Sequence, residues 1–213
     1  MNALHNSARV AQTLDRLHSE ASSQGLVLAK GLAKGIFRKL RPEDMKDAYI
    51  AISRDQGLFL HDLIQERGSK SIVEFGTSLG ISTIYLAEAA QQNNGHVITT
   101  ELLPEKCAVA QANFEEAGLA EVIELREGDA LKTLANLEEE IDLLMLDGWN
   151  DLYRPLLHLL EPNLRKGSLI YMDNANFSSS ADILNYFEAI ESRYKRISDP
   201  RMDSRAALFE VIR

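Results

Sequence analysis

The stretch that decides the fold is Ser71-Ile-Val-Glu-Phe-Gly-Thr-Ser-Leu-Gly-Ile-Ser-Thr83. It begins with a short apolar run typical of a buried strand, and Gly76 and Gly80 follow within a tight loop. From Ile81 to Ala90 the apolar spacing predicts a helix. A strand, a glycine turn and a helix in this order form a ligand cradle in many α/β folds.

The chain beyond this stretch alternates between strand-like and helix-like segments. We expect strands at 71–75, 96–101, 121–126, 141–147 and 168–173, and helices between them at 80–92, 104–117, 130–137 and 152–162. A helix at 179–193 and strand-like runs at 194–198 and 206–212 complete the pattern. Strands separated by helices predict a parallel sheet covered on both faces. The last run could enter the sheet in either direction.

The N-terminal part is expected to be helical but has no recognisable motif. A helix is expected over 4–21, with its buried positions at Leu4, Val10, Leu14 and Leu17. Further helices are expected from Pro42 through Met45, Tyr49 and Ile52, and from a cap at Ser53 or Asp55 to Gly68. We assign residues 1–44 to an N-terminal helix and flap within the same domain as residues 45–213, and we see no second domain.

A basic segment at 28–41 stands out within this N-terminal part. Lys30, Lys34 and Arg38 recur every four residues, so they would share one helical face. Residues 1–41 carry seven basic and two acidic side chains, whereas the whole chain has a net charge of −9. The segment is either a solvated basic face or a flap that attracts an anionic ligand.

Composition narrows the class of protein. The 213 residues are 45% hydrophobic and 26% charged, as in a globular domain with a full core. The acidic balance argues against nucleic acid as a partner, because phosphate binding needs clustered cations. The single cysteine, Cys107, cannot form an internal disulfide and is expected in the core. Without a signal-like run or a span of ~20 apolar residues, we expect a cytoplasmic protein with no membrane partner.

The candidate ligand site lies at the strand ends. In an open parallel sheet, ligands bind outside the carboxyl ends of the strands. Glu101 ends the second expected strand, and its carboxylate could accept the two hydroxyls of a ribose. Asp129 follows the third, where it could accept the amino group of adenine or simply cap the next helix.

The glycine spacing selects among nucleotide-like ligands. Dinucleotide sites use Gly-x-Gly-x-x-Gly, whose close glycines let a pyrophosphate approach the helix. This chain has Gly76-x-x-x-Gly80 and also lacks the lysine-containing loop of triphosphate sites. A cofactor that contains adenosine but no phosphate needs neither pattern, and S-adenosylmethionine is such a cofactor.

At these motifs the chain resembles the class I S-adenosylmethionine-dependent methyltransferases, and among them the catechol and caffeoyl-CoA O-methyltransferase group. The resemblance covers about residues 45–175, with the motifs Val73–Ser82, Ile98–Glu101, Gly128–Ala130, Leu146–Tyr153 and Tyr171–Asn174. It implies a three-layer Rossmann-like fold with a seven-stranded, mostly parallel sheet and an antiparallel final strand. By similarity, the cofactor would be bound by Glu74, Gly76, Thr77, Ser78, Gly80, Ser82, Glu101, Leu102, Asp129, Ala130, Asp147 and Trp149.

A second site is expected where the fourth and fifth strands end. Asp147 and Asp173-Asn174 would converge there if the two strands are neighbours, and such oxygen ligands suit Mg²⁺ or Ca²⁺. The resemblance implies the same three residues as metal ligands. The alternative is that the two aspartates only bind backbone N–H groups in their own loops.

The chain departs from the group at Asn150. The group commonly has a lysine base here, next to the metal-type Asp147, and an asparagine cannot accept a proton at neutral pH. Asp147 and Asn150 remain our candidate catalytic residues. Either the metal alone activates the acceptor, Lys30 or Lys34 replaces the base, or the acceptor is not catechol-like.

These observations leave several functions open. The first is metal-assisted O-methylation of a small hydroxylated acceptor, whose acidity would match the basic N-terminal segment. The others are metal-independent O- or N-methylation, non-catalytic binding of the cofactor, and a dehydrogenase, which the glycine spacing disfavours. The apolar N-terminal helix could pair two chains, so we also expect a homodimer.

Overall fold

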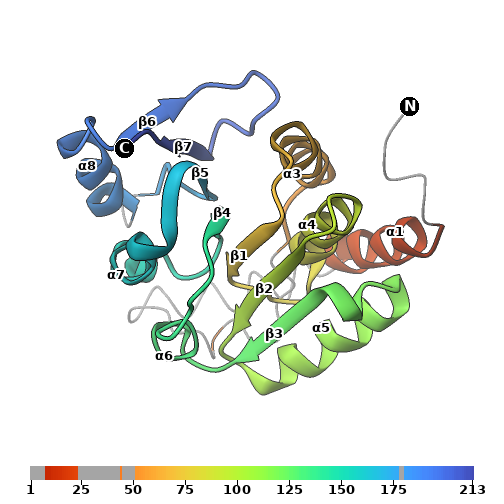
Figure 1. Cartoon of the computed structure of the whole chain (residues 1–213). Helices are drawn as coiled ribbons and strands as arrows, with labels where there is room; N and C mark the ends of the chain where they lie inside the picture. Colours follow the sequence, from red (N-terminus) through yellow and green to blue (C-terminus); the bar gives the residue numbers. More distant parts are fainter. Residues whose placement is uncertain (1–7, 24–43, 45–50, 178–179) are drawn as a thin grey trace.

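The computed structural model describes residues 8–23, 44, 51–177 and 180–213 (Figure 1). Several expectations from the sequence fall outside these residues, including those for Leu4, Lys30, Lys34, Arg38, Pro42, Met45 and Tyr49. Ile52 is described and buried, but it lies in irregular chain and not in the helix expected from Pro42. The remaining expectations can be compared with the structure directly.

The centre of the molecule is a seven-stranded sheet with the order β3-β2-β1-β4-β5-β7-β6. The strands are β1 Ser71–Phe75, β2 His96–Glu101, β3 Ile123–Glu127, β4 Ile141–Leu146, β5 Leu164–Met172, β6 Tyr194–Ile197 and β7 Ala207–Val211. Strands β1 to β5 pair in parallel, whereas β7 pairs antiparallel with both β5 and β6. The expected sheet is therefore confirmed, including its antiparallel β7.

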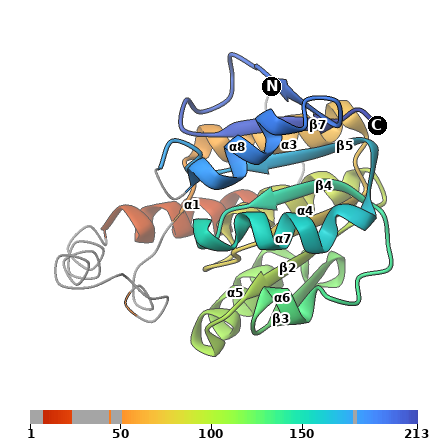
Figure 2. The ribbon, with the colours of Figure 1, turned by 90° about the vertical axis from the view of Figure 1, so that its left-hand side faces the viewer.

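Helices cover both faces of the sheet and make three layers (Figures 1 and 2). They are α1 Ala8–Ser23, α3 Arg54–Arg67, α4 Ile81–Gln92, α5 Pro104–Ala117, α6 Ala130–Thr133, α7 Tyr153–Leu160 and α8 Ala181–Ala189. Helices α1, α3, α4 and α5 lie on one side, and α6, α7 and α8 lie on the other. Among the described residues, no helix is long and apolar enough to cross a membrane.

Strand alternation builds two separate hydrophobic cores. In β1, Ile72 packs in the core under α3 and α4, while Val73 and Phe75 pack in the core under α7. Tyr171 and Met172 of β5 divide between the two cores in the same way. Because β1 is buried on both faces, its sequence is a nearly continuous apolar run.

Several predicted boundaries were wrong, among them the three that follow and the end of α8, which stops at Ala189 and not at residue 193. The third strand begins at Ile123, after a 3₁₀ turn at Ala120–Val122, and not at residue 121. The fifth begins at Leu164, because a shift of register at its start lets the strand contain Gly167, a residue typical of turns. Helix α6 stops at Thr133, and the chain goes on in turns, in which the N–H groups of Ala135 and Leu137 each donate to the carbonyl oxygen three residues earlier.

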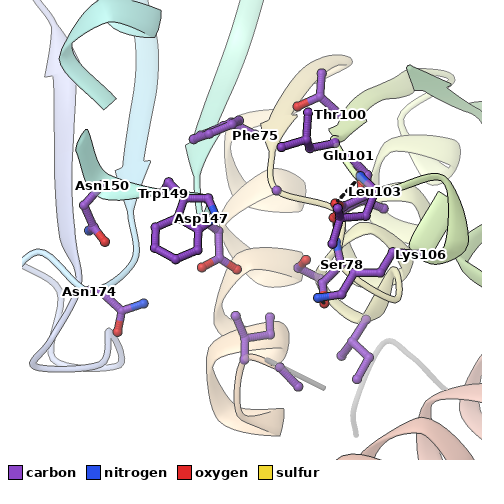
Figure 3. A pocket seen from close by; sticks show the side chains of 18 of the residues that line it. Phe75, Ser78, Thr100, Glu101, Leu103, Lys106, Asp147, Trp149, Asn150 and Asn174 are labelled. Atoms are coloured by element: carbon purple, nitrogen blue, oxygen red, sulfur yellow. Dashed lines mark hydrogen bonds between the residues drawn. The ribbon is translucent and has the colours of Figure 1, made fainter. Parts of the chain in front are cut away.

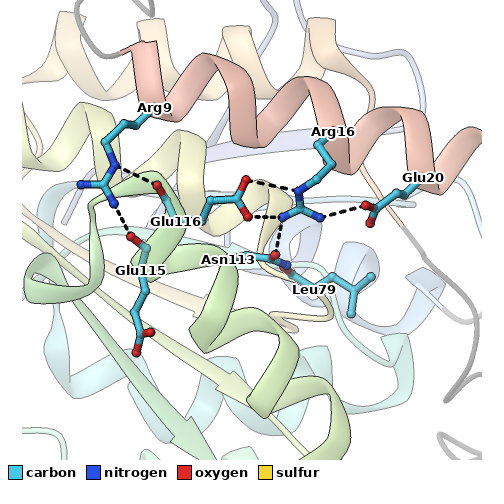
Figure 4. A network of polar contacts seen from close by, with 7 residues as sticks. All are labelled: Arg9, Arg16, Glu20, Leu79, Asn113, Glu115 and Glu116. Atoms are coloured by element: carbon cyan, nitrogen blue, oxygen red, sulfur yellow. Dashed lines mark hydrogen bonds and ion pairs between the residues drawn. The ribbon is translucent and has the colours of Figure 1, made fainter.

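Two helices begin or dock through specific polar contacts. Helix α3 has a capping box, in which Ser53 and Gln56 each accept from the backbone N–H of the other. This decides between the two caps expected from the sequence. Helix α1 docks on α5, where Arg9 donates to the carbonyl oxygens of Glu115 and Glu116 at the end of that helix (Figure 4).

Candidate functional site

A cavity of about 360 Å³ opens at the carboxyl ends of the parallel strands. Its wall comes from the loops after β1, β2, β4 and β5, and from the starts of α4 and α5 (Figure 3). Figure 3 shows Asp147 and Trp149 across the cavity from Ser78, Glu101 and Lys106. The cavity lies where an open α/β sheet is expected to bind its ligand.

The glycine turn after β1 forms the floor of the cavity. The backbone N–H groups of Gly76 and Thr77 both donate to the carbonyl oxygen of Thr100, which fixes the turn to β2. Gly76 has a φ of +106°, and a Cβ atom there would lie 2.6 Å from the carbonyl oxygen of Asp147. This glycine is therefore required by the close approach of the β4 end, in addition to any ligand.

The start of α4 also faces the cavity. Its N-cap is Gly80, which has no side chain to accept from the first helical N–H groups, and Ile81 and Ser82 line the cavity. An uncapped helix start offers N–H groups to an anionic part of a ligand, such as a carboxylate.

Glu101 is held in place at the cavity wall. Its two carboxylate oxygens accept from the backbone N–H groups of Ser78, at 2.9 Å, and Leu103, at 3.0 Å. Each oxygen keeps a second lone pair. The carboxylate is therefore fixed in advance and can accept hydroxyl groups such as those of a ribose.

Glu74 lies beneath the turn and does not line the cavity. It is fully buried, and its Oε2 accepts from the hydroxyls of Thr83 and Thr99. Its Oε1 is buried without a hydrogen-bond partner among the described residues. Burial raises the pKa of this carboxyl, and the three hydroxyls of Ser82, Thr83 and Thr99 partly oppose the shift.

Two of the three residues expected at the adenine, Asp129 and Ala130, do not line the cavity, whereas Trp149 does. Asp129 caps α6, because its side chain accepts from the backbone N–H of Leu131 at 3.0 Å, and Ala130 is buried in the core behind it. Capping was one of the two roles expected for Asp129, and its contact with adenine stays a prediction. Of the expected cofactor residues, the cavity is lined by Gly76, Thr77, Ser78, Ser82, Glu101, Leu102, Asp147 and Trp149, and not by Glu74, Gly80, Asp129 or Ala130.

Two carboxyl groups meet at the ends of β4 and β5, which are neighbours as expected. Asp147 lines the cavity and Asp173 lies directly behind it. Burial raises the pKa of both groups, and the negative charges of Asp173 and Glu74 raise that of Asp147 further. Gln56 holds Asp173 from the other side, donating from Nε2 at 2.9 Å. A cation between the two carboxylates would offset their repulsion.

Asn174 can complete a set of oxygen ligands. It lines the cavity with a φ of +53°, and its Nδ2 donates to Oδ2 of Asp173. A half-turn of this amide would present its oxygen beside the two carboxylates. In the described part of the chain, no group of three or more His, Cys, Asp and Glu side chains is placed to hold a metal. Two carboxylates and one amide are nevertheless donors that fit Mg²⁺ or Ca²⁺, which take further ligands from water.

Asn150 lines the cavity, but its side chain donates a hydrogen bond, whereas a general base would have to accept a proton. Its Nδ2 donates to Oγ of Ser180 at 2.8 Å. The amide therefore acts as a donor between two loops.

Sequence reasoning missed several residues of the cavity wall, among them Lys106, Phe177 and Ile52. Lys106 is 7% exposed, and its Nζ lies 3.4 Å from Oγ of Ser78. Phe177 (53% exposed) and Ile52 also line the cavity, and Phe177 joins Leu102 (42% exposed) as a large exposed apolar side chain of the wall. The start of α5, Pro104-Glu105-Lys106, matched no motif and gave no signal for Lys106. Phe177 follows the Asp173-Asn174 motif by three residues and could have been found from that position.

Comparison of the chain with known proteins was consistent with this geometry. A family model described as O-methyltransferase matches residues 28–198. A catechol O-methyltransferase of Niastella koreensis is 38% identical over 129 residues, which are 59% of this chain and 58% of the relative. A caffeoyl-CoA O-methyltransferase of Eucalyptus globulus is 27% identical over 193 residues, covering 81% of this chain and 78% of the relative. The chain thus spans a little under three fifths of the length of the catechol enzyme of Niastella koreensis.

Solved structures support the fold. An O-methyltransferase of Bacillus cereus, crystallised in complex with S-adenosylhomocysteine, superposes with a TM-score of 0.72 at 23% identity, covering 95% of this chain and 91% of that chain. The O-methyltransferase TomG of Streptomyces achromogenes, in complex with S-adenosylmethionine, gives a TM-score of 0.66 at 22% identity, over 89% and 90% of the two chains. The Rossmann-like methyltransferase fold expected from the sequence is therefore confirmed.

Proposed function

The chain belongs to the O-methyltransferase family, and we propose that it transfers the methyl group of S-adenosylmethionine to a hydroxyl oxygen of a small acceptor. The observation that carries this proposal is the preformed cavity. In it, the fixed carboxylate of Glu101, the glycine turn and the uncapped start of α4 face one space.

Three parts of the cofactor have a fitting group in this cavity. Glu101 would accept the ribose hydroxyls, and the N–H groups at the start of α4 would receive the methionine carboxylate. Trp149 offers the adenine a flat apolar surface.

The acceptor would lie at the end of the cavity formed by Asp147, Asn174 and Phe177. The exposed ring of Phe177 suits a flat aromatic acceptor, and the relatives' names refer to catechol and caffeoyl-CoA. We therefore propose a small hydroxylated aromatic molecule, with a negative charge as a further expectation from the basic segment at 28–41.

A divalent cation fits the donors Asp147, Asp173 and Asn174, and when bound it would lower the pKa of the acceptor hydroxyl. In the reaction, the acceptor oxygen forms a bond to the methyl carbon while the bond from that carbon to sulfur breaks. The hydroxyl proton passes to solvent water, and S-adenosylhomocysteine remains. Glu101 and Trp149 would hold the donor on one side of this line, and Phe177 the acceptor on the other. Such alignment supplies a large part of the rate of a two-substrate reaction.

A metal-independent reaction is the second candidate. The observation that favours it is Asn150, which replaces the expected lysine and is bound to Ser180. In the described part of the chain, the carboxyl that lines this end of the cavity is that of Asp147. It would then be the group that receives the proton.

Binding and turnover measurements test the proposal. We expect calorimetry to show binding of S-adenosylhomocysteine and none of NAD, and we expect the protein to methylate catechol with added Mg²⁺. Asp147→Asn should abolish turnover while retaining most cofactor affinity. Asp182→Asn, which removes one partner of an exposed ion pair with Arg154, is the control and should keep full activity.

Each result has a distinct meaning. Binding of NAD alone would overturn the cofactor assignment. Full activity in the presence of a chelator would exclude a role for the cation and would favour the metal-independent reaction. Tight binding without methyl transfer to any of a broad panel of acceptors would contradict the proposed activity. The homodimer and the cytoplasmic location stay predictions from the sequence.

A further inference from the structure

A side-chain hydrogen bond between Asn150 and Ser180 joins the loops after β4 and β5. Asn150 follows β4 and donates from Nδ2 to Oγ of Ser180 at 2.8 Å. Ser180 directly precedes α8 and is completely buried. Asn150 lines the cavity together with Asn174, and the two side chains lie near each other (Figure 3).

Ser180 is in turn hydrogen-bonded to the backbone of Asn174. Its hydroxyl donates to the carbonyl oxygen of Asn174 at 2.9 Å. The same oxygen accepts from the backbone N–H of Phe177 at 3.1 Å, and the N–H of Ser180 donates to the carbonyl oxygen of Phe177 at 2.9 Å. The three hydrogen bonds close a turn that presents Asn174 and Phe177 to the cavity.

Asn174 needs such support because of its backbone. Its φ of +53° lies in the left-handed region, which costs an asparagine less than most residues but is still unfavourable. The Ser180 hydroxyl can donate once, and it donates to Asn174 because Asn150 occupies its lone pair. The two hydrogen bonds therefore run in the same direction, because Asn150 donates to Ser180 and Ser180 donates to Asn174.

We propose that Asn150 is a positioning residue that, through Ser180, fixes Asn174 and Phe177 at the acceptor end of the cavity. Asn150 stands at the position where the catechol and caffeoyl-CoA O-methyltransferase group has a lysine base. There it orients neighbouring residues and does not transfer a proton. The cofactor end is held separately, by contacts among Gly76, Ser78, Thr100 and Glu101. Trp149, the proposed adenine contact next to Asn150, is one of several cofactor contacts, so the link should affect the metal and the acceptor more than the cofactor. This inference rests on the proposed function.

The test compares Asn150→Ala, Ser180→Ala and the double variant with the wild type. Asn176→Ala is the matched control, because Asn176 is an exposed asparagine in the same turn that does not line the cavity. MgCl₂ is titrated by calorimetry into each protein saturated with S-adenosylhomocysteine. We expect each single variant to bind Mg²⁺ about 5- to 10-fold more weakly, as the loss of one hydrogen bond implies. The double variant should be no weaker than the weaker single variant, and Asn176→Ala should be unchanged.

Cofactor and acceptor measurements separate positioning from general damage. Affinity for S-adenosylhomocysteine should change less than about twofold in all variants, while the KM for catechol rises severalfold in Asn150→Ala and Ser180→Ala. Equal Mg²⁺ affinity and KM in the wild type and the single variants would overturn the inference, as would additive losses in the double variant.

A fluorescence readout distinguishes this inference from the proposed metal. Trp149 is the sole tryptophan of the chain and directly precedes Asn150. Acrylamide quenching of Trp149 should increase in Asn150→Ala and Ser180→Ala but not in Asn176→Ala. If the wild type binds no Mg²⁺, the metal step fails, and the quenching and the KM values still decide the inference. Unchanged quenching in both variants would overturn it.

Discussion

Glu88 is a buried carboxyl that the proposed chemistry does not use. It lies in α4, is 3% exposed, and neither of its carboxyl oxygens has a hydrogen-bond partner among the described residues. Nε2 of the buried His61 lies 4.0 Å from its Oε2, too far for a hydrogen bond. Burial raises the pKa of Glu88 to about 7 and lowers the pKa of His61. Glu88 is therefore expected to be neutral in the folded protein in mildly acidic solution.

The raised pKa of Glu88 predicts that stability falls as the pH rises. Because its pKa in the folded state lies above the usual value of 4.5, the group contributes fully below pH 4.5. That contribution is lost as the pH rises through about 7. We expect Glu88→Gln to match the wild type near pH 4.5 and to be more stable by about 3 kcal/mol near pH 8.5. Urea unfolding at both pH values measures the difference.

A control at an exposed site accompanies this measurement. Glu121→Gln changes an exposed carboxylate, so its free energy of unfolding should differ from the wild type by less than about 0.5 kcal/mol at both pH values. A difference for Glu88→Gln that does not depend on pH would contradict the assignment.

At the scale of elements, helix α1 is connected to the glycine turn by hydrogen bonds that run through a side chain of α5. Arg16 of α1 donates to Oδ1 of Asn113 at 2.7 Å, and Nδ2 of Asn113 donates to the carbonyl oxygen of Leu79 at 2.9 Å (Figure 4). Arg16 also binds Glu116 and Glu20. Since Leu79 lies inside the turn, α1 and α5 together hold the floor of the cavity. An N-terminal element without any motif thus supports the site.

Asn113→Ala should weaken cofactor binding, because Asn113 is 3% exposed and its loss leaves a buried carbonyl oxygen without a donor. We expect the Kd for S-adenosylhomocysteine to rise about 5- to 20-fold, as measured by calorimetry. Gln111→Ala, at an exposed position of the same helix, is the control and should bind normally. Equal affinity in the two variants would show that the turn does not need this support.

At the scale of the whole molecule, the strand order creates the site. Strand β1 lies between β2 and β4, and β5 follows β4, so four loops that are distant in sequence meet at one edge. The cavity exists only when this sheet is formed. Its ligand should therefore stabilise the entire fold.

S-adenosylhomocysteine should raise the melting temperature of the protein. At 100 times its Kd, a ligand that binds only the folded state adds about 2.7 kcal/mol, which corresponds to about 5–10 °C for a chain of this size. Scanning calorimetry of the wild type with S-adenosylhomocysteine, and with NAD as the comparison, measures both shifts. An equal shift with NAD would contradict the preference inferred from the glycine spacing.

The sequence by itself determined the sheet, the glycine turn, Glu101 and the meeting of Asp147 with Asp173. These depend on local patterns, because apolar periodicity marks each strand and a parallel sheet brings all strand ends to one edge. Helix and strand boundaries were less predictable where a distant side chain replaced a local bond. Helix α6, for example, gives way after Thr133 to a turn segment that is held by Asn163, whose side chain donates to the carbonyl oxygens of Leu137 and Glu139.

Only the tertiary structure decided how these residues are used. Gly76 is required by the end of β4, and Gly80 by the ring of Phe114, which a Cβ atom would meet at 2.3 Å. Asn150 has its partner 30 residues away in Ser180. The physical reason is that such roles arise from contacts between segments far apart in the chain. Residue spacing and local propensity describe only neighbours along the chain.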